Sequence, residues 1–223
     1  MDVKLLFQAI IKFLLGLIFV FLFLFIPAGT LNYWNGWLFI GILFVPMFIV
    51  GIILMIINPK LLKKRLDINE KQSEQKWVLL FSGLIFIFGF ISAGFDYKFK
   101  WMQLPKIVVI ISVVLFLIEY ILYAEVLREN AYLSRTIKIQ ENQKVIDTGL
   151  YGIVRHPMYS VTILLFLTMP LVLGSFMSFL IFLFYPFIIA KRIKGEEEIL
   201  ERELDGYKQY KEKVKYKLIP FIW

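Results

Sequence analysis

Residues 158–190 read MYSVTILLFLTMPLVLGSFMSFLIFLFYPFIIA, a run of 33 residues without a charged side chain. A helix needs about 20 apolar residues to cross the roughly 30 Å hydrocarbon core of a bilayer, so this run is too long for one crossing. Pro170 and the pair Gly174 and Ser175 lie near its middle and favour a tight reversal there. The stretch therefore predicts a helical hairpin in a membrane.

Four further apolar segments are long enough, or nearly long enough, to span a membrane: residues 5–26, 34–57, 77–95 and 107–127. Hydrophobic residues make up 60% of the 223, and the mean hydropathy is +0.76. Soluble domains are only about 45–50% apolar. We expect an all-α, multi-pass integral membrane protein with a bundle of five to six transmembrane helices, a C-terminal helical hairpin and a cytosolic C-terminal segment. A large soluble catalytic domain is excluded.

The chain shows no internal repeat and no low-complexity linker, so we expect a single membrane domain over residues 1–223. Residues 1–127 would supply the N-terminal spans, and residues 128–223 carry most of the polar motifs. Residues 19–26 lack the small-residue cleavage pattern of a signal peptide, so the first span is expected to remain as a helix.

Composition excludes several kinds of chemistry. The chain has no cysteine, which excludes disulfides, thiolate zinc sites, iron–sulfur clusters and cysteine nucleophiles. His156 is the single histidine, so a multi-histidine metal site is excluded, and no metal is expected. The formal net charge of +8 is explained by basic cytosolic loops and does not require a nucleic acid partner.

Basic residues concentrate in three polar segments. Residues 58–76 contain six Lys or Arg, residues 128–156 five and residues 191–217 nine, whereas residues 27–33 and 170–175 contain none. Because cytosolic loops are enriched in Lys and Arg, both termini are predicted to face the cytosol, and a cell membrane is the expected location. The two long polar segments of the second half then share one face and can build one site.

The first candidate segment, residues 147–159, reads DTGLYGIVRHPMY. Its two glycines permit a tight turn, and Pro157 suits the first turn of a helix. Arg155 and His156 would then lie at a helix N-terminus, where backbone amides and a guanidinium attract an anion. The alternative is that Arg155 is one more cytosolic charge and His156 a helix cap.

The second candidate segment, residues 191–200, reads KRIKGEEEIL and brings Glu196, Glu197 and Glu198 close to a basic membrane surface. The alternative is a solvated helix start in which Arg192 pairs with Glu196 four residues later. Together, the two segments offer an arginine, a histidine and carboxylates. That set fits a ligand that carries both a carboxylate and an ammonium group.

Two acids interrupt the predicted span 107–127. Acidic residues within a membrane usually face a cavity or are paired. For Glu119, pocket lining and pairing inside the bundle both stay open, while Glu125 is expected at the cytosolic edge beside Arg128.

These motifs resemble a known family. RHPMY at residues 155–159, preceded by GLYGIV and followed after the hairpin by the three glutamates and Leu200, looks like the signature of the isoprenylcysteine carboxyl methyltransferases. These are integral membrane enzymes, and phospholipid N-methyltransferases are related to them. The C-terminal run LDGYKQYKEKVKYKLIPFIW, residues 204–223, is similar to that family's ending in its spaced tyrosines and its closing Ile-Pro. The resemblance covers residues 125–223.

The resemblance implies an S-adenosylmethionine pocket at the cytosolic face, enclosed by the C-terminal segments, and a lipid-like substrate that enters from the bilayer. Residues 128–223 would form the cofactor-binding catalytic half. The family pattern assigns the cofactor to Tyr151, Arg155, His156, Tyr159, Glu196 and Glu197, with Glu197 and Glu198 as the rival glutamate pair. It also implies that Arg192, together with Arg155, orients the acceptor as a catalytic group.

The chain departs from the family pattern in three places. Val161 stands where a glycine is expected, Leu204 and Asp205 replace an expected Phe-Gly pair, and the spacing to Tyr207 is one residue short.

The implied reaction suits these residue types. Methyl transfer from a sulfonium requires positioning and exclusion of water, and needs neither a metal nor a thiol. A carboxylate acceptor is already ionised at neutral pH and needs only an arginine clamp, whereas an amine needs a base such as His156. We expect a membrane methyltransferase that uses S-adenosyl-L-methionine and acts on a hydrophobic or lipid-linked acceptor, such as an isoprenylcysteine-like carboxylate.

Two alternative functions remain. One is an NADPH-dependent membrane reductase resembling the steroid five-alpha-reductases, whose cofactor phosphates the glutamates would repel. The other is a non-enzymatic transporter or scaffold. The identity of the acceptor, the atom that is methylated and the oligomeric state stay open.

Overall fold

The computed structural model describes residues 3–67, 73–134 and 139–223. Within these ranges the chain is helical and forms no strand. Its elements are α1 (Val3–Ala28), α2 (Trp34–Ile57), α3 (Pro59–Leu66), α4 (Ser73–Phe99), α5 (Lys106–Glu129), the 3-10 helix η1 (Gly149–Gly152), α6 (Pro157–Val172), α7 (Phe176–Phe182), α8 (Tyr185–Glu203) and α9 (Tyr207–Lys213). Lys71, Arg135 and Lys138, three of the basic residues behind the predicted orientation, lie outside the described residues.

Among the residues that the structure describes, five helical segments are long and apolar enough to cross a membrane: α1, α2, α4, α5 and residues 176–203, which comprise α7 and α8. The shorter α6, with 16 residues, is a sixth apolar helix. The prediction of an all-α membrane bundle with five to six spans is confirmed. One span is longer than predicted, because α4 continues past residue 95 to Phe99. The charged Asp96 in this extension is buried, and its carboxylate accepts a hydrogen bond from the backbone N–H of Met102.

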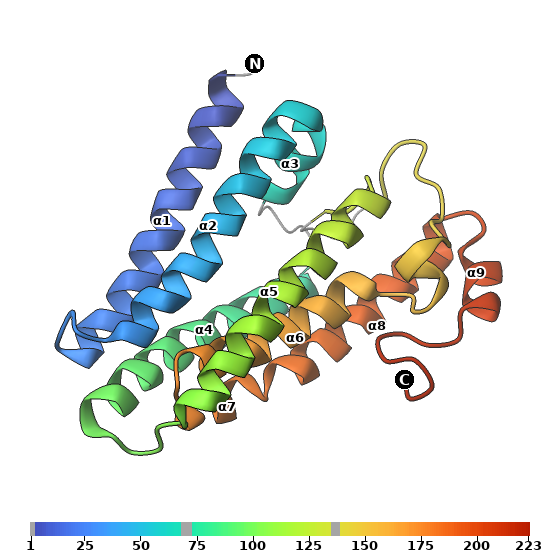
Figure 1. Cartoon of the computed structure of the whole chain (residues 1–223). Coiled ribbons are helices and arrows are strands. Elements are labelled where there is room, and N and C mark those ends of the chain that lie inside the picture. The colour runs from blue at the N-terminus through green and yellow to red at the C-terminus, as the bar shows by residue number, and fades with distance from the viewer. Residues whose placement is uncertain (1–2, 68–72, 135–138) are drawn as a thin grey trace.

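The predicted hairpin is present and consists of α6 followed by α7 and α8 (Figure 1). The chain reverses at Gly174, whose φ of +74° lies in the left-handed region that glycine adopts without strain. Ser175 then caps α7, because its hydroxyl accepts a hydrogen bond from the backbone N–H of Ser178 at 3.1 Å. The second arm breaks again before Pro186 in the first turn of α8, which the apolar pattern alone does not reveal.

Buried phenylalanines join four helices at the centre of the bundle. Phe39 of α2 contacts Phe90 of α4 and Phe116 of α5, with ring centroids 5.8 and 6.1 Å apart. Phe90 in turn lies 6.1 Å from Phe182 of α7. All four rings are almost completely buried, so packing of large side chains holds the N-terminal and C-terminal halves together.

Hydrogen bonds fasten one end of the bundle. The fully buried carboxylate of Asp96 accepts from the Ser175 hydroxyl at 2.5 Å and from the backbone N–H of Met102 at 2.7 Å. Nearby, the Tyr33 hydroxyl donates to the carbonyl of Leu173 at 2.7 Å. The turns after α1, α4 and α6 are therefore tied together by satisfied polar groups.

The opposite end, which we call the basic end, gathers the polar motifs. It comprises α3, the last turn of α5, η1, the first turn of α6, the last turns of α8, and α9 with the following residues 214–223 (Figure 1). The two polar segments that the sequence assigns to one face thus lie together. The orientation of this end toward the cytosol stays a prediction.

Candidate functional site

A cavity of about 710 Å³ opens at the basic end and extends into the bundle. Its volume falls within the roughly 300–1,000 Å³ typical of sites for small molecules and cofactors. Both halves of the chain contribute to its walls, which combine two chemically different parts.

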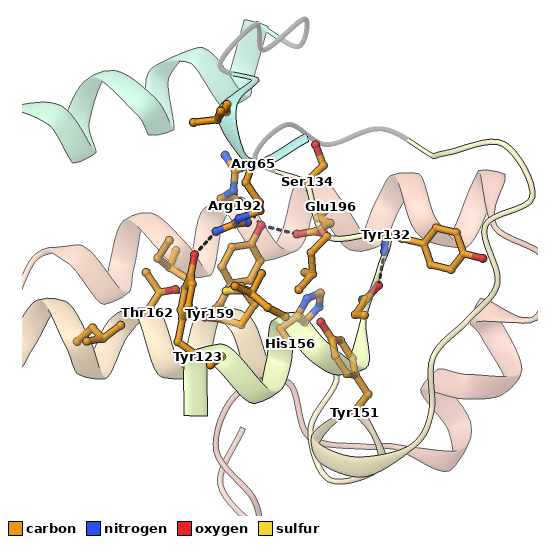
Figure 2. Close-up of a pocket in the computed structure, with 18 of the residues that line it drawn as sticks. Arg65, Tyr123, Tyr132, Ser134, Tyr151, His156, Tyr159, Thr162, Arg192 and Glu196 are labelled. Atoms are coloured by element: carbon orange, nitrogen blue, oxygen red, sulfur yellow. Dashed lines mark hydrogen bonds between the residues drawn. The ribbon is translucent and has the colours of Figure 1, made fainter. Parts of the chain in front are cut away.

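The polar part of the cavity is built by the C-terminal half. It is lined by Gln143, Lys144, Tyr151, Arg155, His156, Glu196, Tyr207 and Tyr210. The apolar part is lined mainly by α1, α2 and α4, through Ala9, Phe13, Leu43, Met47, Val50, Leu54, Val78 and Phe86. Between them lies a junction formed by Arg65, Tyr123, Tyr159, Thr162 and Arg192 (Figure 2). The cavity can therefore hold a polar molecule and an apolar chain in contact with each other.

At the junction, the Tyr159 hydroxyl connects two charged groups of α8. Arg192 donates from Nε to this hydroxyl at 2.8 Å, and the hydroxyl donates to Oε2 of Glu196 at 2.5 Å. The Arg192 guanidinium also lies over the Tyr159 ring, 5.9 Å from its centroid. Arg192 and Glu196 are thus bridged by a tyrosine from α6, and the positions of all three depend on one another.

Arg155 faces away from this bridge and binds the C-terminal segment. Its Nε donates to Oε1 of Glu197 at 2.7 Å, and its Nη1 donates to the carbonyls of Val214 and Lys215 at 2.8 and 2.7 Å. Lys217 adds a second cation 3.3 Å from the other oxygen of Glu197. This buried ion pair therefore fastens the segment that follows α9.

His156 is the N-cap residue of α6, and Pro157 begins the helix, as the sequence predicts. The Nε2 atom of His156 lies 3.2 Å from Oε1 of Glu197. Its ring stacks on Tyr159 at 5.7 Å, and its backbone N–H donates to the carbonyl of Lys217 at 2.9 Å. His156 thus couples the C-terminal segment to the junction.

Two buried hydroxyls in the polar part, those of Tyr151 and Tyr207, form no hydrogen bond of standard geometry with the described residues, although the Asn130 side chain lies close to the Tyr151 hydroxyl. Burial raises the pKa of both side chains well above the usual value, so both remain protonated donors at neutral pH. A buried hydroxyl without a hydrogen-bond partner destabilises the folded protein, because it has lost its hydrogen bonds to water. Within a cavity, such groups indicate where a polar ligand would complete the wall.

Local sequence explains the position of Tyr151. Gly149 has a φ of +51°, and a Cβ there would collide with the carboxylate of Glu129 at the end of α5. That carboxylate accepts from the backbone N–H of Leu150 at 3.0 Å and fixes η1 against α5. Tyr210 of α9 fixes it from the other side, because its hydroxyl donates to the carbonyl of Tyr151 at 2.7 Å.

The structure brings most of the predicted site residues to one cavity. Its walls include Tyr151, Arg155, His156, Tyr159, Arg192 and Glu196. Glu197 is buried behind the wall in its pair with Arg155, and Glu198 is exposed. Three consecutive helical residues point in three directions, so only Glu196 of the three faces the cavity.

The two acids that interrupt the predicted span 107–127, Glu119 and Glu125, lie outside the cavity lining. Glu119 is buried and accepts a hydrogen bond from the Thr168 hydroxyl at 2.8 Å, which selects pairing inside the bundle over pocket lining. Glu125 pairs with Arg128 at 2.6 Å, as expected.

Sequence reasoning missed several residues of the cavity. Arg65 and Tyr123 come from the half that showed no motif, and Lys12 is a single charge within the apolar segment 5–26. Tyr207 and Tyr210 belong to the C-terminal run whose spaced tyrosines resemble the family ending. Within the described parts of the chain, no group of three or more His, Asp or Glu could hold a metal ion.

A model of the isoprenylcysteine carboxyl methyltransferase (ICMT) family matches residues 99–202. The matched segment contains α5, η1, α6, α7 and α8 almost to its end. Most of the polar part and much of the junction lie within it, whereas Arg65 precedes it and Tyr207 follows it. No curated protein matches the chain.

Proposed function

Residues 99–202 of this chain belong to the isoprenylcysteine carboxyl methyltransferase family, and from this premise we propose that the protein is an S-adenosylmethionine-dependent membrane methyltransferase. The acceptor would be a hydrophobic or lipid-linked molecule with a carboxylate. The methyl donor would occupy the polar part of the cavity, and the acceptor's hydrocarbon chain would occupy the apolar part.

One observation carries this proposal: the polar and apolar parts meet at Tyr159 and Arg192 inside one continuous cavity. A methyltransferase with a lipid-like acceptor must bring a charged, water-soluble donor to a molecule that prefers the bilayer. A cavity with one polar end and one apolar end meets that requirement.

The residues of the polar part fit the proposed cofactor. S-adenosylmethionine carries an ammonium and a sulfonium, a carboxylate and ribose hydroxyls. Glu196 offers a carboxylate to the cationic groups, and the hydroxyls of Tyr151 and Tyr207 offer hydrogen bonds to the polar oxygens. In this arrangement Glu197 lies behind the cavity wall and binds Arg155, which in turn binds the C-terminal segment.

When bound, S-adenosylmethionine supplies a methyl group on a sulfonium, which an acceptor oxygen takes in an in-line displacement while the S–C bonding pair stays on sulfur. The Arg192 guanidinium, held by Tyr159, would orient the acceptor carboxylate at the junction. Because a carboxylate is ionised at neutral pH, no residue has to remove a proton. The C-terminal segment that Arg155 holds would exclude water from the polar part.

Calorimetric titration of S-adenosylmethionine into the detergent-purified chain tests the proposal. Saturable binding is expected, and Glu196→Gln should weaken it about tenfold or more, because a hydrogen bond to a charged group is worth roughly 1.5–3 kcal/mol. Glu198→Gln is the matched control, because it makes the same change two residues away on an exposed side chain. Tyr151→Phe should weaken binding as well, without loss of fold.

NADPH is titrated under the same conditions. Binding of NADPH in place of S-adenosylmethionine would favour a reductase and overturn the proposal. An absence of cofactor binding, both alone and with N-acetyl-S-farnesylcysteine present as acceptor, would overturn it too.

A further inference from the structure

We propose that Arg65, from the N-terminal half of the chain, is a second acceptor-binding residue that holds the acceptor's anionic group together with Arg192. This inference rests on the proposed function and adds a specificity-determining residue that lies outside the family match. It assigns a role in the site to α3, the short amphipathic helix between the second and third spans.

Arg65 reaches the junction because three contacts hold α3 there. Nη2 of Arg65 donates to the hydroxyl of Tyr123 on α5, and the Arg65 guanidinium lies 5.6 Å from the centre of the Tyr123 ring. Lys12 of α1 donates to the carbonyl of Leu66, and Lys64 donates to the carbonyl of Ala131 at 3.2 Å. The last turn of α3 is thus attached to α1 and to the chain on both sides of the end of α5.

Arg65 and Arg192 are held in the same way, although they come from different halves of the chain. Each guanidinium donates to a tyrosine hydroxyl and lies over the ring of that tyrosine. Figure 2 shows Arg65, Tyr123, Arg192 and Tyr159 grouped at the junction, with Glu196 on the side of the polar part. Two guanidiniums therefore line the boundary between the polar and the apolar parts.

The charges of the lining favour an anion at this boundary. Its cationic side chains are Lys12, Arg65, Lys144, Arg155 and Arg192. Glu196 is the sole carboxylate among the described lining residues, and it already accepts from Tyr159. Arg155 is neutralised by Glu197. Among the described residues, the printed partner of the Arg65 guanidinium is the uncharged Tyr123 hydroxyl, so this cation can also bind an anionic ligand.

The apolar walls fix which part of the ligand would reach Arg65. Leu62 and Leu66 of α3 line the cavity beside it, and Leu54 and Val50 of α2 continue the wall into the bundle. An acceptor whose chain lies along this wall would present its polar end at the junction. Arginine binds a carboxylate through two parallel hydrogen bonds, and two arginines at one site would select an acid over an amine or an amide.

The test compares two probes on the full-length, detergent-purified chain by equilibrium binding: N-acetyl-S-farnesylcysteine and its carboxamide, which is identical in shape but uncharged. The wild type should bind the acid more tightly than the amide. Arg65→Gln should reduce this preference about tenfold while amide binding and S-adenosylmethionine binding stay within about twofold, because only the charged contact is lost. Arg65→Lys should restore part of the preference.

Two controls separate recognition from structure. Lys63→Gln removes a positive charge from the exposed side of the same helix and should leave the preference unchanged. Tyr123→Phe removes the hydroxyl that holds Arg65 and should have a smaller effect than Arg65→Gln.

Equal losses of acid and amide binding in Arg65→Gln would show a structural role and overturn the inference, as would an unchanged preference. A wild type that fails to bind S-adenosylmethionine but prefers the acid through Arg65 would overturn the proposed function and leave this inference standing.

Discussion

Arg155 and Glu197, 42 positions apart in the sequence, form an ion pair of 2.7 Å whose side chains are only 5% and 6% exposed. The pair joins the start of α6 to α8. Nη1 of Arg155 donates to the carbonyls of Val214 and Lys215, so the pair also helps to determine where the chain runs after α9. Both residues look like ligand-binding groups in the sequence. In the structure Arg155 is part of the cavity wall, and Glu197 lies buried behind that wall and fixes Arg155 in place.

Replacing Arg155 with alanine should destabilise the protein. The substitution leaves Glu197 buried without its main partner and frees two backbone carbonyls, and breaking a buried ion pair on one side costs about 3–5 kcal/mol. The apparent melting temperature in detergent should fall clearly. Arg128→Ala, which breaks the exposed pair with Glu125, should change it little. Equal melting temperatures for the two variants would contradict a supporting role for Arg155.

Tyr159→Phe should lower methyl transfer without unfolding the protein. The variant keeps the ring under the Arg192 guanidinium but loses the hydroxyl that connects Arg192 to Glu196. Loss of a hydrogen bond to a charged group costs roughly 1.5–3 kcal/mol, so kcat/KM should fall about tenfold or more. Tyr97→Phe, which removes a hydroxyl at the opposite end of the bundle, serves as the control. A Tyr159→Phe variant with full activity would show that the bridge does not orient the reacting groups.

The parts of the fold that local chemistry determines could be predicted from the sequence. The apolar runs specified the spans, Gly174 and Ser175 specified the hairpin reversal, and Pro157 specified the start of α6. Each of these features depends on a few neighbouring residues, so one sequence is sufficient to identify it.

The orientation of the site residues could not be predicted in the same way. Glu196 and Glu197 are neighbours with the same side chain, yet they face different environments. Tyr159 of α6 binds Glu196, and Arg155, just before α6, binds Glu197. Arg65 carried no local signal, because its place depends on how α3 packs against α5. Distinctions of this kind require tertiary structure.

Alkaline pH should destabilise the basic end through its buried tyrosines. Burial raises the pKa of Tyr151 and Tyr207 above the unfolded value near 10. Their contribution to stability is complete below pH 10 and is lost as the pH rises above it, because the unfolded chain releases these protons first. Each tyrosine then lowers the free energy of unfolding by at most about 1.4 kcal/mol per pH unit.

Melting curves between pH 8 and 11 measure this loss. Tyr207→Phe removes one titrating group, so its melting temperature should fall less steeply above pH 10 than that of the wild type. Parallel curves for the two proteins would show that Tyr207 does not contribute to the alkaline transition.

Ser175→Ala should weaken the bundle at the end opposite the cavity while leaving the site intact. The Ser175 hydroxyl donates to the fully buried carboxylate of Asp96 and accepts from the N–H of Ser178 at the start of α7. Its removal costs a helix cap, worth about 0.5–2 kcal/mol, and a hydrogen bond to a charged group, worth roughly 1.5–3 kcal/mol. The melting temperature should therefore fall, whereas the affinity for S-adenosylmethionine should stay unchanged at a temperature where the variant is folded. A parallel loss of affinity would mean that the two ends are coupled through the central phenylalanines. In that case, the basic end could no longer be treated as a site that forms independently of the far turns.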